Sequence, residues 1–394
     1  MKRQPTVLST FSGAGGLDLG LEAAGFHTLS CIELDATARQ TLAANRSHWN
    51  LWAEPDIVRA AKKVTPSALG LKVGELDVLA GGPPCQPFSK AAQWAPRGMA
   101  GLDDPRAKTL TAFTSLLETF LPRVMLIENV PGFVMGRTSA VDAIARALRR
   151  INRKHKTSYA LDIRLLNAEE HGIPQARRRA ILVATRDGES IAWPTPTPTP
   201  TRSFDALVHV RPRSIPEASG AWAWLLPTIP PGQNYLFHTP SGGGEPFFGE
   251  RRRFWSFLLK LDPARPAWTL PAKPGPSTGP FHWENRPLAI EEMLALQTFP
   301  HDWRVSGGRG AQVRQVGNAT PPLLAELVGR ALGTSLFSLT YTRPPLREVR
   351  RATERLPALR TSHVPAKLKP QGKPPAPHPG EGRGPNPSRH PMRD

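Results

Sequence analysis

The stretch VLSTFSGAGGLDLGLEAAGF, residues 7–26, decides the fold class of this chain. Residues 7–11 have the apolar character of a buried strand, and residues 17–24 place leucines at helical spacing. The glycines between them let the backbone turn tightly and approach a ligand beside the helix N-terminus. Another apolar run follows at residues 28–32. The stretch therefore predicts a strand, a glycine turn, a helix and a second strand of an α/β protein.

The same alternation continues along residues 6–187. Further strands are predicted at residues 78–80, 124–127 and 180–185, and further helices at residues 36–44, 108–120 and 140–150. Strands that alternate with helices are typical of a mostly parallel sheet covered by helices. We therefore predict an α/β fold for the first half of the chain.

The composition changes at TPTPTPT, residues 195–201. This repeat indicates a stiff connector, because proline favours extended backbone. Pro, Gly, Arg and aromatic residues then dominate up to residue 283, and helical patterns resume at residues 288–297 and 321–333. After residue 342, twelve prolines in 52 residues predict disorder. We expect a catalytic and cofactor-binding domain (1–190), a small, mainly irregular or β domain (191–300), a segment returning to the catalytic domain (301–342) and a disordered basic tail (343–394).

The charge of the chain points to a polyanionic partner. The 394 residues carry a net charge of +19, of which residues 343–394 contribute +8. The body is thus basic by itself, which favours binding to nucleic acid or to an anionic surface. No apolar run is long enough to cross a bilayer, and residues 1–10 lack the features of a signal peptide. With two cysteines and no zinc-ligand spacing, we expect a cytoplasmic protein without a metal.

The glycine turn and two acidic residues predict a nucleoside pocket. Glu33 ends the second strand, where a carboxylate can accept hydrogen bonds from ribose hydroxyls. Asp56 and Ile57 offer a carboxylate for an adenine amino group and an apolar contact for its ring. No glycine stands three residues after Gly15, so the dinucleotide pattern is absent. The ligand is expected to be a nucleoside without a pyrophosphate.

The segment DVLAGGPPCQPFS, residues 77–89, presents a cysteine at the end of an apolar strand. Glycines and prolines there would place Cys85 on a rigid turn at the edge where open α/β sheets bind ligands. A thiol in basic surroundings becomes a thiolate, which is a strong nucleophile. Cys31 lies within an apolar strand and is expected to be an inert core residue.

Two further segments carry polar groups at strand ends. Glu128 follows the apolar run 124–127 and could protonate or hydrogen-bond a ring nitrogen. In QARRR, residues 175–179, an extended backbone would place Gln175, Arg177 and Arg179 on one face and Arg178 on the other.

Taken in order, these segments resemble the DNA (cytosine-5) methyltransferases, especially those of bacterial restriction–modification systems. FSGAGG (11–16), PPCQPFS (83–89), ENV (128–130) and QARRR (175–179) are similar to motifs of the family, as are residues 286–300 and 315–322. The resemblance covers about residues 6–335 and implies the S-adenosylmethionine-dependent methyltransferase fold with a target-recognition domain. One departure is a longer stretch after Lys90, in the catalytic loop of the family.

The resemblance implies a mechanism and a set of site residues. Cys85 would add to carbon 6 of a flipped cytosine, Glu128 would bind N3 and the exocyclic amine, and carbon 5 would take the methyl group. Arg179 would hold the cytosine O2, and Arg177 would help to order the pocket; the base that removes the proton would be water. The predicted cofactor-binding residues are Phe11, Gly13, Ala14, Gly15, Gly16, Glu33, Leu34, Asp56, Ile57, Pro84 and Asn318.

The implied partner is double-stranded DNA, whose sites would be read by residues 191–283, including the arginines 251–253 and the loop 241–244. The resemblance further implies a nucleoid-associated monomer, with a possible cognate endonuclease that acts on the same site without direct contact. Three other functions are weighed. A tRNA methyltransferase of the same fold remains an alternative. A catalytically idle DNA-binding relative is disfavoured because the motifs are intact, and an oxidoreductase because its glycine spacing is missing.

Overall fold

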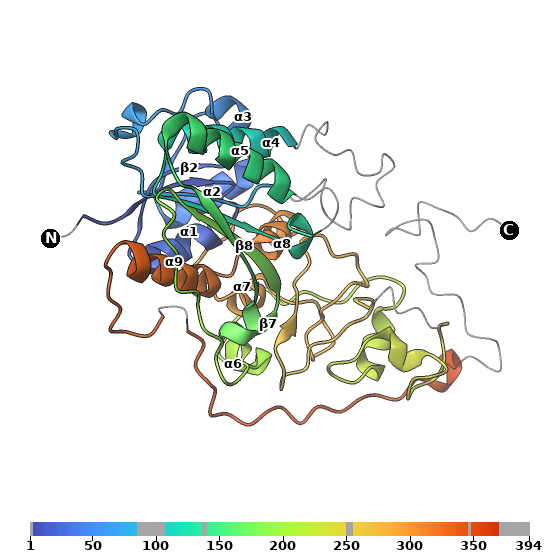
Figure 1. The fold of residues 1–394 in the computed structure, drawn as a ribbon. Helices are drawn as coiled ribbons and strands as arrows, with labels where there is room; N and C mark the ends of the chain where they lie inside the picture. Colours follow the sequence, from blue (N-terminus) through green and yellow to red (C-terminus); the bar gives the residue numbers. More distant parts are fainter. Residues whose placement is uncertain (1–2, 85–106, 136–139, 250–254, 346–347, 370–394) are drawn as a thin grey trace.

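A computed structural model describes residues 3–84, 107–135, 140–249, 255–345 and 348–369 of the chain (Figure 1). The strands are β1 Thr6–Thr10, β2 His27–Ile32, β3 Asn50–Leu51, β4 Val78–Gly81, β5 Val124–Asn129, β6 Ala160–Asn167, β7 Gln175–Ala176, β8 Arg178–Thr185 and β9 Ala267–Trp268. The helices are α1 Gly16–Ala23, α2 Ala36–Asn45, α3 Ile57–Ala60, α4 Ala107–Phe120, α5 Ala140–His155, α6 Ser203–Leu207, α7 Ile290–Leu296, α8 Arg309–Asn318 and α9 Pro322–Leu336.

A seven-stranded sheet forms the centre, in the order β3-β2-β1-β4-β5-β8-β6. The strands from β3 to β5 run parallel, and β8 runs antiparallel to both β5 and β6. The strands and helices predicted up to residue 187 are all present, with bounds that differ by a few residues. The prediction of a mostly parallel α/β sheet is confirmed.

Two layers of helices cover the sheet, because alternate strand residues point to opposite faces. Leu8, Leu79 and Met125 face α3, α4 and α5, whereas Val7 and Val78 face α1 and α9. Figure 1 shows α3, α4 and α5 together on one side of the sheet, with α1 and α9 on the other. Among the described residues, no helix is both long and apolar enough to cross a bilayer.

The strand β6 and the helix α8 had no counterpart in the sequence prediction. β6 lies at the edge of the sheet, and most of its residues are partly or fully exposed, so it carries no continuous apolar run. α8 contains two glycines and several polar residues, and it contributes only Val313, Gln315, Val316 and Gly317 to the interior. In both elements tertiary packing, rather than an apolar pattern, selects the conformation.

The segment 191–283 contributes to two cores. One is its own, formed by the mainly aromatic and aliphatic side chains Leu225, Leu226, Ile229, Tyr235, Phe248, Leu258 and Phe281. The other is shared with the large domain and includes Phe204, Leu261 and Trp283 beside Leu42 and Trp49. Most aromatic side chains of this segment thus form cores, although Trp255 and Trp268 are exposed.

The expected disorder of residues 343–394 is corrected for the described residues of 343–369. Arg330 of α9 donates hydrogen bonds to the carbonyls of Arg343 and Pro344. Further along, the N–H of Ala352 donates to Asp205 at 3.0 Å, and that of Ser362 donates to the carbonyl of Pro227 at 2.8 Å. Backbone groups paired in this way fix an extended segment without a large apolar content. Residues 370–394 lie outside the described part of the chain.

Candidate active site

The glycine turn after β1 places a carboxylate at the carboxyl edge of the sheet. Phe11, Gly13 and Gly15 all have positive φ, so the backbone bends sharply before α1 begins at Gly16. In this conformation the N–H of Gly13 donates to Oε2 of Glu33 at 2.7 Å, while the N–H of Asp35 donates to Oε1 at 2.8 Å. The Glu33 carboxylate is thus oriented by the backbone on both sides.

Burial raises the pKa of the Glu33 carboxyl, and the hydrogen bonds from Asp35 and Gly13 oppose this shift. Its neighbour Leu34 is 68% exposed and lines the cavity. Asp56 caps the N-terminus of α3 by accepting from the N–H of Val58 at 2.9 Å, and Ile57 beside it is buried. The predicted cofactor residues thus place carboxylates and apolar side chains together.

Gly15 and Gly16 do not line the cavity, in contrast to the prediction. A Cβ on Gly16 would lie 2.0 Å from the carbonyl oxygen of Thr320, and one on Gly15 would lie 2.9 Å from the Leu42 side chain and 3.1 Å from the rings of Trp303 and Trp49. Both glycines are therefore required by close packing, whereas Gly13 has open space around it and faces the cavity.

Glu128 and Arg179 form an ion pair at the same edge. The Arg179 Nε lies 2.8 Å from Oε1 of Glu128, and both side chains are about nine-tenths buried. Both side chains line the cavity, so the carboxylate and the guanidinium face the same space. Next to Glu128, the Asn129 side chain donates to the carbonyl of Pro83 at 2.7 Å and so holds the turn that leads to Cys85.

The alternation predicted for residues 175–179 is confirmed: Gln175, Arg177 and Arg179 are buried and Arg178 is exposed. Arg177, however, does not line the cavity. Its Nη2 donates to the carbonyls of Gly317 at 2.9 Å and Ala319 at 2.8 Å, and burial lowers the pKa of its guanidinium well below the ordinary value. Arg177, which was grouped with the catalytic residues and expected to help to order the pocket, is a positioning residue for the turn after α8.

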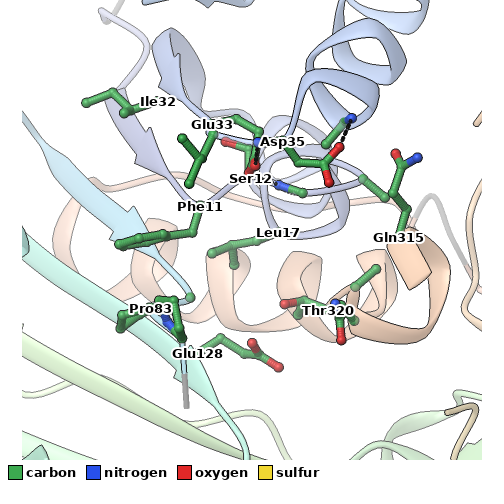
Figure 2. Close-up of a pocket in the computed structure, with 18 of the residues that line it drawn as sticks. Phe11, Ser12, Leu17, Ile32, Glu33, Asp35, Pro83, Glu128, Gln315 and Thr320 are labelled. Carbon is green, nitrogen blue, oxygen red and sulfur yellow. Dashed lines mark hydrogen bonds between the residues drawn. The ribbon is translucent and has the colours of Figure 1, made fainter. Parts of the chain in front are cut away.

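These groups share one cavity of about 630 Å³, within the usual range for a ligand site (Figure 2). In Figure 2, Phe11 and Leu17 lie between Glu33 and Glu128. Phe11, Gly13, Ala14, Glu33, Leu34, Asp56, Ile57, Pro84, Glu128, Arg179 and Asn318 line it, as the sequence predicted. Cys85, the predicted nucleophile, lies outside the described residues, directly after Pro84 in the sequence.

Several lining residues were not predicted, among them Ser12, Asp35, Asn129, Arg314, Gln315 and Thr320. Ser12 and Asn129 stand inside motifs that the sequence already singled out, so they were within reach. Gln315 and Thr320 likewise stand in the motif 315–322, whereas Arg314 precedes it on α8, which was not predicted as a helix. Arg314 donates to Asp35 at 2.7 Å and thereby closes one wall of the cavity.

The fold and the site define a class of protein: an α/β protein in which a glycine turn and a buried Glu–Arg pair line one cavity at the edge of the sheet. Residues 6–219 and 269–334 match the family described as C-5 cytosine-specific DNA methylase. The chain belongs to this family, and it is a DNA cytosine-5 methyltransferase.

Curated relatives agree with this assignment. The chain is 34% identical over 373 residues to the type II methyltransferase M.SacI of Streptomyces achromogenes, covering 84% of this chain and 93% of the relative. It is 32% identical to the type II methyltransferase M.Eco47II of Escherichia coli, covering 83% of this chain and 78% of the relative.

Solved structures show the same fold. A methyltransferase encoded within an Escherichia coli prophage superposes with a TM-score of 0.59 at 22% identity, covering 85% of this chain and all of the other. The methyltransferase EhMeth of Entamoeba histolytica superposes with a TM-score of 0.57 at 16% identity, over 85% and 99% of the two chains.

Proposed function

We propose that the cavity holds S-adenosylmethionine at its Glu33 end and a flipped cytosine at its Glu128 end. The observation that carries this proposal is that both ends line one continuous cavity of a size suited to two such ligands in contact. An enzyme that modifies a base must take it out of the duplex to reach the reacting atom. The Glu128–Arg179 pair offers such a base a matched set of donor and acceptor groups.

The residues at the Glu33 end fit a nucleoside cofactor. The Glu33 carboxylate lies where it can accept from ribose hydroxyls, Asp56 can accept from an adenine amino group, and Leu34 and Ile57 offer apolar contact to the ring. Exposure of Leu34 is explained if an apolar ligand surface covers it in the complex. When bound, S-adenosylmethionine supplies an electrophilic methyl group. We propose that Phe11, Gly13, Ala14, Pro84 and Asn318 complete its binding site.

At the other end, Cys85 acts as the nucleophile. Its thiolate forms a bond to carbon 6 of the cytosine, and the ring electrons move toward carbon 5. Glu128 holds N3 and the exocyclic amine and so stabilises the negative charge that the ring gains when the thiolate adds. Arg179 donates to O2. After carbon 5 has taken the methyl group, it loses its proton to water, and the electrons of that C–H bond restore the ring as Cys85 leaves. Arg177 lies outside the cavity and positions the turn after α8 by donating to the carbonyls of Gly317 and Ala319.

Target recognition is proposed to reside in residues 191–283. The family match leaves residues 220–268 uncovered, as expected for a part that differs between enzymes with different sites. The exposed loop residues Ser241, Gly242 and Gly243 offer backbone and hydroxyl groups to base edges. We propose a monomeric modification enzyme of a restriction–modification system in the bacterial cytoplasm, where an endonuclease would share its site without touching it.

The experiment is covalent trapping on a duplex that contains 5-fluorocytosine at the target. Attack at carbon 6 and methylation at carbon 5 can proceed, but fluorine does not leave as a cation, so elimination stops and the protein stays attached. We expect an adduct that requires S-adenosylmethionine and that mass spectrometry locates in the peptide 81–90. Glu128→Gln should slow its formation about a hundredfold, because a neutral amide is a far weaker acid toward N3.

Two cysteine variants serve as a matched pair. Cys85→Ser should form no adduct and retain less than a tenth of the turnover, with cofactor binding nearly unchanged. Cys31→Ser should still form the adduct, since Cys31 is fully buried in the core and burial raises the pKa of its thiol. An adduct on Cys31, or normal methylation without any adduct, contradicts the roles proposed here.

A further inference from the structure

The outer face of α5 carries a row of exposed arginines. Ala140, Ile144, Leu148 and Ile151 are buried against the sheet, and at about 100° per residue they define the inner face of the helix. Arg146, Arg149 and Arg153 lie on the opposite side, and all three are exposed. Because they are three and four residues apart, their side chains form one row along the helix.

The neighbouring cations of α5 are paired with one carboxylate. Glu118 of α4 accepts from Arg150 at 2.6 Å and from Lys154 at 2.9 Å, and His155 lies 3.6 Å from it. By contrast, no carboxylate of the described residues lies within 4.0 Å of the three guanidinium groups in the row. Asp142 is the acidic residue on this face, near the start of the helix. The row is therefore a net positive surface.

The row lies away from the cavity. Ala160, the first residue of β6, pairs with Thr185, which pairs with Val124, the first residue of β5. Glu128 is at the other end of β5, so the C-terminal half of α5, with Arg149 and Arg153, approaches the edge of the sheet opposite to the active site. Arg146 lies near the middle of the helix. Arg153 stands about 20 Å along the helix from Ala140, at 1.5 Å per residue. A duplex whose cytosine occupies the cavity is thus not the DNA segment that this row would meet.

We propose that Arg146, Arg149 and Arg153 form an auxiliary surface for the sugar–phosphate backbone of a second DNA segment. The row spans about 10 Å. Along one DNA strand there is one phosphate per 3.4 Å of the duplex axis, so this length corresponds to about three phosphates. Arginine binds phosphate oxygens with two parallel donors. The exposed positions of α5 hold no Trp, Phe or Leu, which a membrane-surface helix would need. The proposal rests on the proposed function only in taking DNA as the partner.

The test compares short and long DNA. In the variant Arg146→Gln/Arg149→Gln/Arg153→Gln, kcat/KM on a duplex of about 15 base pairs with one target site should stay within twofold of the wild type. On linear DNA of several hundred base pairs, the non-specific Kd at 0.1 M salt should rise about tenfold. The slope of log Kd against log salt should fall by about 2.7, or 0.9 for each of three lost phosphate contacts.

Two controls make the result specific. Lys62→Gln/Lys63→Gln/Lys72→Gln removes the same charge from other exposed positions and should leave the slope unchanged. The triple Arg→Lys variant of the row should keep most of the affinity. An equal effect in the Lys62 control, an unchanged slope in the row variant, loss of turnover on the short duplex, or tighter binding to phosphatidylserine vesicles than to DNA overturns the proposal. Failure of the wild type to methylate the short duplex would instead count against the proposed function.

Discussion

Arg177 and Arg179 are two residues apart, on the same face of an extended segment, yet they meet different surroundings. Arg179 reaches the cavity and lies 2.8 Å from Glu128, whereas Arg177 is enclosed and donates to two backbone carbonyls. Only Nη2 of Arg177 donates to these carbonyls, and its Nε and Nη1 meet no acceptor among the described residues. Removal of the guanidinium would leave the two buried carbonyls without this donor. One arginine therefore serves the substrate end of the cavity, and the other holds the turn that bears Ala319 and Thr320.

Asp18 is the residue for which a pH dependence of stability can be predicted. It is fully buried in α1, and burial raises its pKa to about 6, partly opposed by hydrogen bonding to Ser9. Since the folded state binds this proton more tightly than the unfolded chain, Asp18 stabilises the fold below about pH 4 relative to higher pH. That advantage is lost as the pH rises through 6, by roughly 3 kcal/mol at most.

The substitution Asp18→Asn removes this titration. We expect the unfolding free energy of the variant, relative to wild type, to rise by up to about 3 kcal/mol between pH 4 and pH 8. Urea unfolding followed by circular dichroism measures it, and Asp142→Asn serves as an exposed control. If the unfolding free energies of Asp18→Asn and of the wild type change in the same way with pH, burial does not raise the pKa of the Asp18 carboxyl as stated.

At the scale of elements, β8 explains how the Gln-x-Arg-x-Arg segment reaches the site. In a parallel strand, functional residues follow the carboxyl end, but β8 is antiparallel to β5, with Asn129 opposite Ala180. Its amino end therefore lies at the edge where β5 delivers Glu128 and Asn129. The reversal of one strand brings residues 175–179 beside the residues that end β4 and β5.

Helix α1 depends on glycine where it meets α9 and the turn before it. Gly16→Ala should lower the unfolding free energy by more than 2 kcal/mol, because its Cβ would collide with the Thr320 carbonyl at 2.0 Å. Gly13→Ala should cost only about 1–2 kcal/mol, the penalty of a positive φ, since its nearest neighbour atom is 3.9 Å away. Thermal unfolding of both variants checks the order, and an equal loss would contradict it.

At the scale of the whole molecule, residues 343–369 connect the two domains. Their described part contacts α9 through Arg330, α6 through Asp205 and the small domain through Pro227 and Glu245. Ala352 and Leu359 also pack against the core that both domains share. This segment therefore stabilises the position of residues 191–283 relative to the domain that holds the sheet.

Two truncations test this role. A chain ending at residue 369 should unfold at the temperature of the full chain and keep its target site. A chain ending at residue 342 should lose roughly 2 kcal/mol, or about 3 °C in Tm, because the buried partners of residues 343–369 are exposed. Calorimetry and methylation assays measure both. Identical behaviour of the two truncated chains would show that residues 343–369 contribute nothing.

Exchange of residues 191–283 for the corresponding residues of a relative should transfer the methylation site of that relative. The reason is that this segment has its own core and therefore can change its loops without disturbing the sheet. Bisulfite sequencing of DNA from cells that express the hybrid reads the outcome. An active hybrid that keeps the original site would place recognition elsewhere.

The sequence by itself determined five of the seven strands of the sheet, the helices α1, α2, α4 and α5 that flank it, and the polar residues at both ends of the cavity. Apolar runs identify buried strands, and residues such as Gly13, Glu33 and Glu128 stand at strand ends, which share one edge of a parallel sheet. These relations join residues that are close together along the chain, so the order of the residues is enough to reveal them.

Other features were decided only by tertiary structure. The sequence could not separate Gly13 from Gly15 and Gly16, because the difference lies in Trp303 and Thr320, some 300 residues away along the chain. Nor could it show that Arg177 faces backbone carbonyls or that α8 closes the cavity. It also could not show that residues 348–369 are hydrogen-bonded to residues such as Asp205. Each of these depends on which distant backbone groups and side chains come within a few ångströms, and spacing along the chain does not encode that.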